Sequence, residues 1–272
     1  MLAAAIASRT EQIQIHLAAL IAPLHDPVRL AEDLAVLSLI SNGRVVPVIS
    51  AGYREEEFEA IGKSLKDRKH YMDMIIPFLR QAFTGEAFEY EGRTIQVTPK
   101  PDVVPMLVMG GSSRPAALRA ARQADYFIPS VPDIWDIYRD ELQRLGKPDM
   151  GPAARQPATV YFVAEDPDAY WQQLAPHAMH EQNSYAEWAE QSGIASPYSY
   201  YRNSDDLRDS GKYTVMTAQE MVALITRMDD AEPLILSPLV GGLHPDLAWQ
   251  NLQLFEREVF PHIGASNDGV FR

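Results

Sequence analysis

The sequence predicts an α/β fold in which parallel strands alternate with helices. Short apolar runs of strand length recur along the 272 residues, and most are followed by a segment with helical periodicity. Glycine, proline and small polar residues separate many of these segments. A strand followed by a helix returns to its sheet through a right-handed crossover, which makes neighbouring strands parallel.

The first elements are a helix, a strand and a second helix. MLAAAIASRT predicts a short amphipathic helix, because Leu2 and Ile6 are four residues apart and share one face. The apolar run IQIHLAALIAP predicts a buried strand at about 13–22. Asp26 is expected to N-cap the following helix, whose first residue is Pro27. The expected apolar stripe of that helix comprises Leu30, Leu34 and Leu37.

A second strand, a third helix and a hairpin come next. VVPVIS predicts a strand at 45–50, although Pro47 removes one ladder donor. The loop after it contains REEEFE, a run typical of a solvated helix start, and a helix is expected at about 67–83. FEYEGRTIQV alternates about Glu91 and Gly92, which predicts a small surface hairpin.

The rest of the chain continues the alternation. Further strands are expected at 104–109, 126–129, 158–164 and 233–237. Further helices are expected directly after Ser113, at about 133–145 and 166–180, from Thr217 with Glu220 completing a capping box, and at 245–260. Residues 190–213 are polar, aromatic and turn-rich, and are expected to form a lid or binding loop.

This reading gives six parallel strands, preceded by a helix. A closed (β/α)8 barrel of the TIM type needs eight strands. We therefore expect one domain over residues 1–272, of the TIM-barrel type but N-terminally incomplete, with its first two βα units absent. Composition alone fits an open six-stranded sheet equally well.

Composition excludes several classes of function. The formal net charge is −13, with 37 acidic and 24 basic residues and no basic cluster, which argues against nucleic acid and anionic membranes as partners. The absence of cysteine excludes disulfides and thiolate chemistry and makes the cytoplasm the expected compartment. No apolar run approaches membrane-spanning length. At 46% hydrophobic residues, the chain is able to bury a sizeable core.

A row of small residues, Gly110, Gly111, Ser112 and Ser113, stands between an apolar strand and a helix. Ligands of parallel α/β proteins bind at the carboxyl ends of strands, and glycines there let a ligand approach the backbone. Ser112 or Ser113 is expected to cap the helix, whose free N–H groups attract phosphate, and Arg114 adds positive charge. An ordinary strand-to-helix turn with a serine cap explains the same residues.

Two further groups are candidates for ligand contact. Gly241 and Gly242 form a second glycine pair before a helix, although a tight turn needs the same residues. His177, His180 and Glu181 follow the spacing i, i+3, i+4 and lack an evident third metal ligand, so no metal site is expected. Pocket-lining side chains or solvated helix positions are the other two interpretations. No Ser/His/Asp order or pair of acids suggests a catalytic constellation.

Four stretches together resemble the luciferase-like monooxygenase family, which includes flavin- and deazaflavin-dependent (factor 420) oxidoreductases. They are LAALIAPLHDPVRLAEDLAVLSLISNGR, SAGYREEEFEAIG, MLVMGGSSRPAALRAARQADYFIPS and PLVGGLHPDLAWQNLQLFEREVFP. The resemblance covers most of residues 1–262. No single stretch is diagnostic, and their order and spacing carry the identification.

The resemblance implies a cofactor site. FMN, or alternatively the deazaflavin factor 420, would bind at the carboxyl-end mouth of a barrel, with its phosphate at residues 110–113. Ala18 and Ala19 fall where many members place a non-prolyl cis peptide beside the isoalloxazine. Ala51 stands where some luciferases carry a phosphate-binding arginine, so either Arg114 compensates for this departure or the affinity for FMN is low.

The implied activity is that of an FMN- or deazaflavin-dependent oxidoreductase, monooxygenase-like, acting on a small organic substrate. The expected partners are that substrate, a flavin reductase and a second copy of the chain in a homodimer. The cofactor performs the chemistry, so few catalytic side chains are expected. A non-catalytic or truncated flavin-binding paralogue is the alternative. An aldolase or isomerase barrel would need a lysine or paired acids at strand ends, and none is evident.

Overall fold

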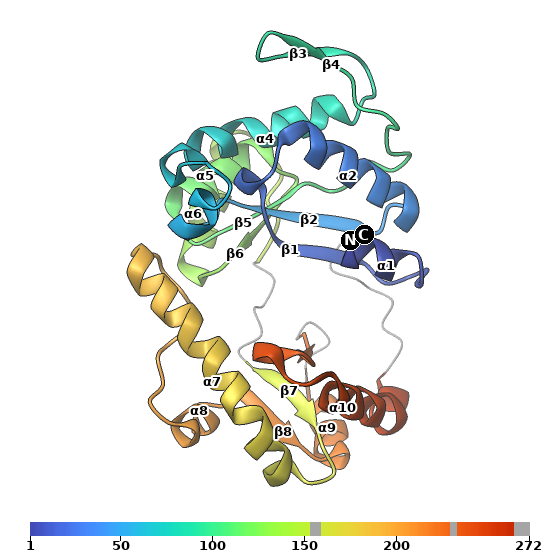
Figure 1. The fold of residues 1–272 in the computed structure, drawn as a ribbon, viewed down its shortest axis with the longest axis vertical. Helices are drawn as coiled ribbons and strands as arrows, with labels where there is room; N and C mark the ends of the chain where they lie inside the picture. Colours follow the sequence, from blue (N-terminus) through green and yellow to red (C-terminus); the bar gives the residue numbers. More distant parts are fainter. Residues whose placement is uncertain (153–158, 229–232, 264–272) are drawn as a thin grey trace. The chain divides into compact units, whose positions relative to one another are not determined.

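Apolar runs form the strands of the computed structural model, and the turns between them carry most of the glycines in left-handed conformation. The structure describes residues 1–152, 159–228 and 233–263. They fall into two compact units (Figure 1), described separately below. The first unit comprises Met1–Ala153 with Ser192–Ala195, and the second comprises Ala154–Gln191 with Ser196–Arg272.

The first unit contains a four-stranded parallel sheet in the order β1-β2-β5-β6. Its strands are β1 (Ile15–Ile21), β2 (Val45–Ser50), β5 (Val108–Gly111) and β6 (Tyr126–Pro129). The predicted strands at 13–22, 45–50 and 126–129 are confirmed, with β1 shorter at both ends. Pro47 lies inside β2 opposite Leu17 of β1, and the register with β5 begins only at Val48.

The third predicted strand, at 104–109, was wrong in its bounds. β5 begins four residues later and includes both glycines, because Gly110 pairs with Ile128 and Gly111 with Pro129 of β6. Pro105 has no N–H to donate to a ladder, and the residues around it stay outside the sheet. The glycines therefore belong to the strand and not to the loop after it.

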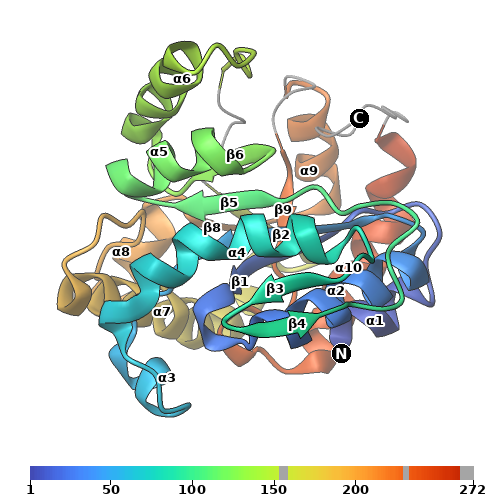
Figure 2. The same cartoon turned by 90° about the horizontal axis from the view of Figure 1, so that it is seen from above.

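Helices connect these strands and cover the sheet (Figures 1 and 2). They are α1 (Leu2–Ala7), η1 (Ala22–Leu24), α2 (Pro27–Ser41), α3 (Glu55–Glu59), η2 (Leu65–Asp67), α4 (Arg68–Ala82), α5 (Arg114–Gln123), η3 (Pro132–Ile134) and α6 (Trp135–Arg144). The N-cap of α2 is confirmed, since Asp26 accepts hydrogen bonds from the backbone N–H groups of Val28 and Arg29. Its predicted stripe is buried: Leu30, Leu34 and Leu37. In Figure 2, α5 lies beside β5 and β6, and α6 lies on the same side of β5 but further from it.

The first helix is confirmed, but the apolar face that Leu2 and Ile6 share does not pack against the core. Leu2 and Ile6 are 77% and 36% exposed, whereas Ala7 is buried with Ile15 of β1 and Val45 of β2. A six-residue helix docks most closely through its smallest side chains, so alanines contact the core and the larger side chains face outward.

The side chain of Arg44 links α1, α2 and the segment before β1 through hydrogen bonds. Its guanidinium donates five hydrogen bonds, to the backbone oxygens of Ala7, Thr10, Ile13 and Ser41 and to the Thr10 hydroxyl, at 2.7 to 3.0 Å. One side chain thereby joins the end of α1, the segment before β1 and the end of α2.

A two-stranded hairpin follows α4 and is separate from the parallel sheet. Its strands are β3 (Phe88–Tyr90) and β4 (Arg93–Ile95), which pair antiparallel. Glu91 and Gly92 both have positive φ, of 47° and 71°, as a two-residue type I′ turn requires. Phe78 of α4 packs edge-on against Phe88 and Tyr90. The predicted hairpin is confirmed.

The second unit contains a three-stranded parallel sheet in the order β8-β7-β9. Its strands are β7 (Val160–Val163), β8 (Tyr213–Met216) and β9 (Ile235–Leu236), and its helices are α7 (Pro167–Ser192), α8 (Ser204–Asp209), α9 (Ala218–Ile225), η4 (Val240–Gly242), α10 (Pro245–Glu258) and η5 (Phe260–His262). The capping box of Thr217 and Glu220 is confirmed. The described residues thus form seven parallel strands rather than the predicted six, and the sixth predicted strand shrinks to β9.

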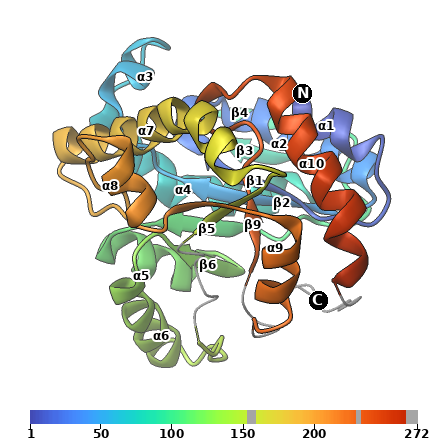
Figure 3. The same ribbon diagram turned by 90° about the horizontal axis from the view of Figure 1, so that it is seen from below.

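Helices cover both faces of this sheet. Phe162 points toward a cluster with Trp171 of α7, whereas Val163 packs with Met221 of α9 and Leu254 of α10. Figures 1 and 3 show α7 and α8 on one side of β7 and β8, and α9 and α10 on the other. The central strand β7 is therefore enclosed on both faces, as its apolar sequence predicts.

The helix predicted at 166–180 continues to Ser192, which corrects its end by twelve residues. Its last turns are polar, but they carry two buried or half-buried amides that bond the chain after them. Gln182 donates to the Ser199 oxygen at 2.9 Å, and Asn183 exchanges two hydrogen bonds with the Tyr201 backbone. Part of the predicted excursion at 190–213 is thus attached to α7, and its final residue already belongs to β8.

Candidate functional site

The carboxyl edge of the first unit's sheet brings most of the predicted site residues together. Ile21 of β1 lies opposite Ser50 of β2, and Gly111 of β5 lies opposite Pro129 of β6. Ala51 follows β2 directly, and residues 112–113 follow β5. Parallel strands present their carboxyl ends at one edge, which is where ligands of such sheets bind.

Close packing explains the two glycines of β5. A Cβ atom on Gly110 would lie 2.7 Å from the Ser50 hydroxyl, and a Cβ on Gly111 would lie 2.6 Å from the Cβ of Ala116. The pair therefore lets β2 and the first turn of α5 approach the strand. A phosphate is not needed to account for these glycines, so evidence for an anion site has to come from the helix that follows.

The N-terminus of α5 is open. Ser113 occupies the N-cap position with extended backbone angles, but its side chain makes no capping hydrogen bond, contrary to the expected serine cap. The helix has no acidic residue in its first turn, and Ser113 and Arg114 are both exposed. Pro115 at the second position has no N–H. The remaining N–H groups, the free hydroxyl and the positive end of the helix dipole form a suitable anion cradle.

Arginines near Ala51 were not predicted from the sequence. Arg68, the first residue of α4, donates from Nη1 to the Gly52 oxygen at 2.9 Å. Arg54 lies two residues further along the loop and pairs with Glu57 at 3.2 Å. Arg68 thus brings positive charge to the carbonyl group next to Ala51. Ala51 is the position at which some members of the family that the chain resembles carry a phosphate-binding arginine.

Ala18 and Ala19 lie near the middle of β1, and both are exposed in the described chain. The peptide bond between them is cis, the geometry that the resemblance implied. The register between β1 and β2 also shifts between Ala18 and Leu20. A role for these alanines in cofactor binding stays a prediction.

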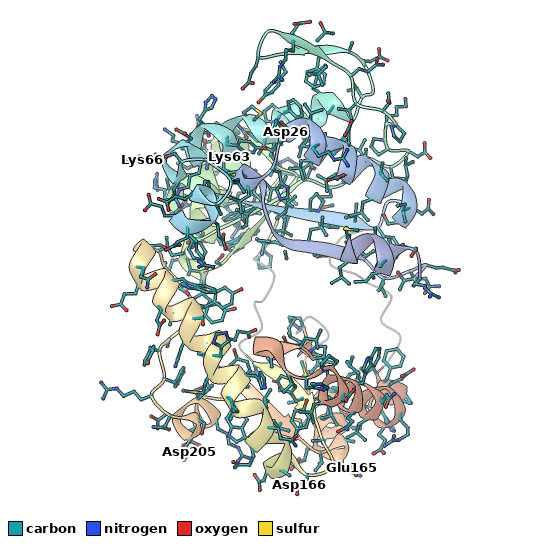
Figure 4. All side chains as sticks on the ribbon, in the orientation of Figure 1. Asp26, Lys63, Lys66, Glu165, Asp166 and Asp205 are labelled. Atoms are coloured by element: carbon teal, nitrogen blue, oxygen red, sulfur yellow. The ribbon has the colours of Figure 1, made fainter. Side chains whose placement is uncertain are left out.

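A lysine and a tyrosine hold the loop after β1, and neither was singled out in the sequence. Lys63 donates from Nζ to the oxygens of Pro23 and His25, at 2.6 and 2.7 Å, and the Tyr71 hydroxyl donates to the same His25 oxygen at 2.8 Å. Burial lowers the pKa of Lys63, and burial together with Lys63 lowers the pKa of the His25 imidazole. The His25 side chain is therefore neutral near pH 7. Figure 4 labels Lys63 and Asp26, which mark the position of this loop in the first unit.

In the second unit, His177 and Gly241 come together, but they bond each other. His177 Nδ1 lies 3.0 Å from the Gly241 oxygen, and the Gly241 N–H faces Glu181 Oε2 at 3.4 Å. The Tyr213 hydroxyl donates to the other Glu181 oxygen at 3.0 Å. Gly241 has φ 52°, and a Cβ on it would lie 2.0 Å from the His177 oxygen. These side chains hold a turn.

The other two candidates of this unit do not join that network. His180 is exposed, with Ser184 Oγ 3.5 Å from its Nδ1, and Gly242 is exposed with open space around it. Among residues 1–152, 159–228 and 233–263, no three His, Asp or Glu side chains gather as metal ligands would. None of the described helices combines the length and the apolar character needed to cross a membrane.

Comparison with known proteins gives a consistent result. A family model described as luciferase-like monooxygenase matches residues 1–222. An FMNH2-dependent dimethylsulfone monooxygenase of Pseudomonas fluorescens is 26% identical over 208 residues, covering 71% of this chain and 57% of the relative. An F420-dependent glucose-6-phosphate dehydrogenase of Amycolatopsis mediterranei is 26% identical, covering 51% of this chain and 44% of the relative. The chain thus spans about half the length of these curated relatives.

Solved structures agree on the fold. A monooxygenase of Streptomyces bottropensis aligns with a TM-score of 0.65 at 20% identity, over 96% of this chain and 81% of that one. An FMN complex of a type II Baeyer–Villiger monooxygenase of Pseudomonas putida aligns with a TM-score of 0.62 at 18% identity, over 96% and 83% of the two chains. The predicted α/β fold of the TIM-barrel type is confirmed.

Proposed function

Since the chain belongs to the luciferase-like monooxygenase family, we propose that it is an FMN- or deazaflavin-dependent oxidoreductase acting on a small organic substrate. The observation that carries this proposal is the open N-terminus of α5 at the carboxyl edge of the sheet. Relatives use both cofactor types, one FMNH2-dependent and another F420-dependent by name.

The residues at this edge fit a phosphate-bearing cofactor. The N–H groups of the first turn of α5 and the Ser113 hydroxyl would bind phosphate oxygens, and Ser112 and Arg114 would flank them. Ala18, Ala19 and Ala51 would offer small side chains against which a planar ring is able to lie. When bound, the cofactor supplies hydride transfer or oxygen activation, and the chain supplies orientation and exclusion of water.

The proposal extends to partners. A monooxygenase that uses reduced FMN needs a flavin reductase to supply it. A factor 420 enzyme does not use FMN and would not need that partner. We also propose that the chain forms a homodimer and that residues within 190–213 act as a substrate lid. For the segment at 199–201 to move, its hydrogen bonds with Gln182 and Asn183 would have to break. His180 and Gly242, exposed in the second unit, remain available to contact substrate.

The phosphate role is tested by a change of charge. Ser113→Glu places a carboxylate at the anion cradle and should weaken binding of FMN or factor 420 about tenfold or more, through like-charge repulsion. Ser64→Glu is the matched control, because Ser64 is an exposed serine that precedes another helical turn of the same unit. The affinities are measured by fluorescence titration with each cofactor.

Three outcomes separate the alternatives. Selective loss in Ser113→Glu supports the site, and the tighter of the two ligands identifies the cofactor. Equal affinities in Ser113→Glu and wild type overturn the phosphate assignment. Tight binding without turnover of any substrate by the reduced cofactor favours a non-catalytic flavin-binding protein instead.

A further inference from the structure

Three aromatic side chains meet near the end of α7 in the second unit. The rings of Tyr185 and Tyr198 are stacked, with centroids 4.5 Å apart and planes 16° from parallel. Trp188 packs edge-on against Tyr185, with centroids 5.2 Å apart. Tyr185 belongs to α7, whereas Tyr198 lies in the segment before α8, which runs beside α7 (Figures 1 and 3). Two phenol rings from different segments are thus in direct contact.

The hydroxyl groups of this stack lie on the side of Tyr213. The Tyr213 hydroxyl donates to Glu181 Oε1 at 3.0 Å, so its position is fixed. Burial raises the pKa of Tyr213, and Glu181, Tyr198 and Tyr185 raise it further. Both phenol oxygens of the stack therefore act on one hydroxyl from the same side. The ring carbons next to those two oxygens are consequently neighbours.

Hydrogen bonds hold the chain on either side of Tyr198 against α7 and β8. They run from Lys212 Nζ to the Pro197 oxygen at 2.7 Å, from Gln182 Nε2 to the Ser199 oxygen at 2.9 Å, and in both directions between Asn183 and the Tyr201 backbone at 2.8 and 2.9 Å. The contact between the two rings is thus maintained by the backbone around it. Groups held in contact in this way react as though they were highly concentrated.

Stacked phenols are suited to oxidative coupling. Loss of one electron and one proton from each tyrosine gives two phenoxyl radicals, whose unpaired spin lies partly on the ring carbons next to oxygen. Coupling of one such carbon from each ring forms a C–C bond, and the two ring hydrogens then move to the oxygens and restore the phenols. In balance, two tyrosines and one hydrogen peroxide give one dityrosine and two waters, with a haem peroxidase as the one-electron oxidant.

An oxidant reaches the stack through Tyr185. Tyr185 and Tyr200 are the two exposed tyrosines of the described residues, at 37% and 60%. Tyr198 is half-buried, but its contact with Tyr185 lets an electron pass between the rings, so a second oxidation of Tyr185 completes the radical pair. The chain contains no cysteine, whose thiol would donate a hydrogen atom to a phenoxyl radical and end the reaction.

We propose that Tyr185 and Tyr198 form an oxidative cross-linking site, at which a one-electron oxidant joins the two rings as dityrosine. The new bond attaches residues 196–201 covalently to α7. The cross-link depends on neither the proposed cofactor nor the anion site. Only its consequence for the proposed substrate lid, part of which it would immobilise, rests on the proposed function.

The test exposes the full chain to a haem peroxidase and hydrogen peroxide at low protein concentration. We expect dityrosine fluorescence in the monomer band of a denaturing gel. Mass spectrometry of a digest should then identify two peptides joined through Tyr185 and Tyr198 with the loss of two hydrogens. The yield per chain should not fall on dilution, because the rings react within one molecule. After oxidation, the amides at 199–201 should exchange more slowly with deuterium.

Conservative variants separate this pair from the other tyrosines. Tyr185→Phe and Tyr198→Phe each keep an aromatic ring but remove one phenol, and each should lower the intrachain yield about tenfold or more. Tyr200→Phe is the matched control, because it removes the more exposed phenol and leaves the stack, and its yield should stay within about twofold of wild type. Unfolding in urea separates the two rings and should abolish their preference over other tyrosines.

The proposal is overturned if no dityrosine forms, if it forms only between chains, or if the intrachain bond joins other tyrosines. A wild-type yield in Tyr185→Phe or in Tyr198→Phe would overturn it as well. Equal yields of the Tyr185–Tyr198 bond in the folded and the urea-unfolded chain would contradict the argument from ring contact.

Discussion

The glycine pair of the first unit and the glycine pair of the second stand in the same sequence context, after an apolar run and before a helix. At Gly110 and Gly111 the glycines are strand residues that admit β2 and α5. At Gly241 the backbone oxygen is bonded by His177 and the backbone N–H by Glu181, and we call this the clamped turn. The same sequence pattern thus forms part of a closely packed strand in the first unit and the clamped turn in the second.

The helices after the two pairs differ in the same way. Ser113 leaves the N-terminus of α5 without a side-chain cap, and the first turn contains Arg114 and no acid. His244 caps α10 by accepting from the Asp246 N–H, and Asp246 places negative charge in that first turn. The positive end of the α10 dipole is compensated within the chain, whereas the start of α5 has neither a side-chain cap nor an acid in its first turn. Glycines alone therefore do not indicate an anion site, and the site proposed at α5 depends on the state of its helix start.

The largest expected effect tests the clamped turn. Gly241→Ala should destabilise the protein by about 3 kcal/mol or more, because the new Cβ meets backbone 2.0 Å away at a positive φ. Gly242→Ala is the control, since Gly242 also has positive φ but open space, and it should cost about 1 kcal/mol. Denaturant unfolding measures both. Equal losses would show that the close contact with His177 is unimportant.

A smaller loss of unfolding free energy is expected when His177 is replaced, and His180 provides the comparison. His177→Ala leaves the Gly241 oxygen without its partner and should cost about 1–2 kcal/mol of unfolding free energy. His180→Ala, on the exposed face of the same helix, should change it by less than about 0.5 kcal/mol. Thermal and denaturant unfolding of both variants decide the matter. If His180→Ala is the more damaging change, the clamp is assigned to the wrong histidine.

The smallest effect tests the packed strand. Gly110→Ala should cost about 1 kcal/mol, because the new Cβ would lie 2.7 Å from the Ser50 hydroxyl, which is able to turn aside, and 3.2 Å from Cγ1 of Val48. Ser50→Ala in the same chain should recover part of that loss, since it removes the nearer of these two atoms. Unfolding of the two single variants and the double variant gives the coupling. Additive losses would mean that the glycine is needed for another reason.

Much of the fold follows from local patterns in the sequence. The Asp26 cap, the Glu91–Gly92 turn and the box of Thr217 and Glu220 each depend on residues within a few positions of one another, and each is observed. β8 was missed because its four residues follow a polar segment and are stabilised by β7, about fifty residues earlier in the chain. The end of α7 was missed because its last turns are polar and bond to residues 199–201.

The candidate site was predictable in outline but not in its supporting contacts. The carboxyl-edge position of residues 110–114 follows from strand order alone. Lys63, Tyr71 and Arg68 support the neighbouring loops through bonds to carbonyl oxygens 16 to 46 residues away in sequence. A carbonyl is present at every position and leaves no mark in a sequence.

The five hydrogen bonds of Arg44 make several segments open as one. Its guanidinium holds the end of α1, the approach to β1 and the end of α2, and its own oxygen accepts from Ile15 at 2.8 Å. No one of these segments is able to fray without breaking bonds that the others share. In hydrogen–deuterium exchange, amides near Ala7, Ile15 and Ser41 should lose protection together, as a single cooperative opening rather than as three independent ends.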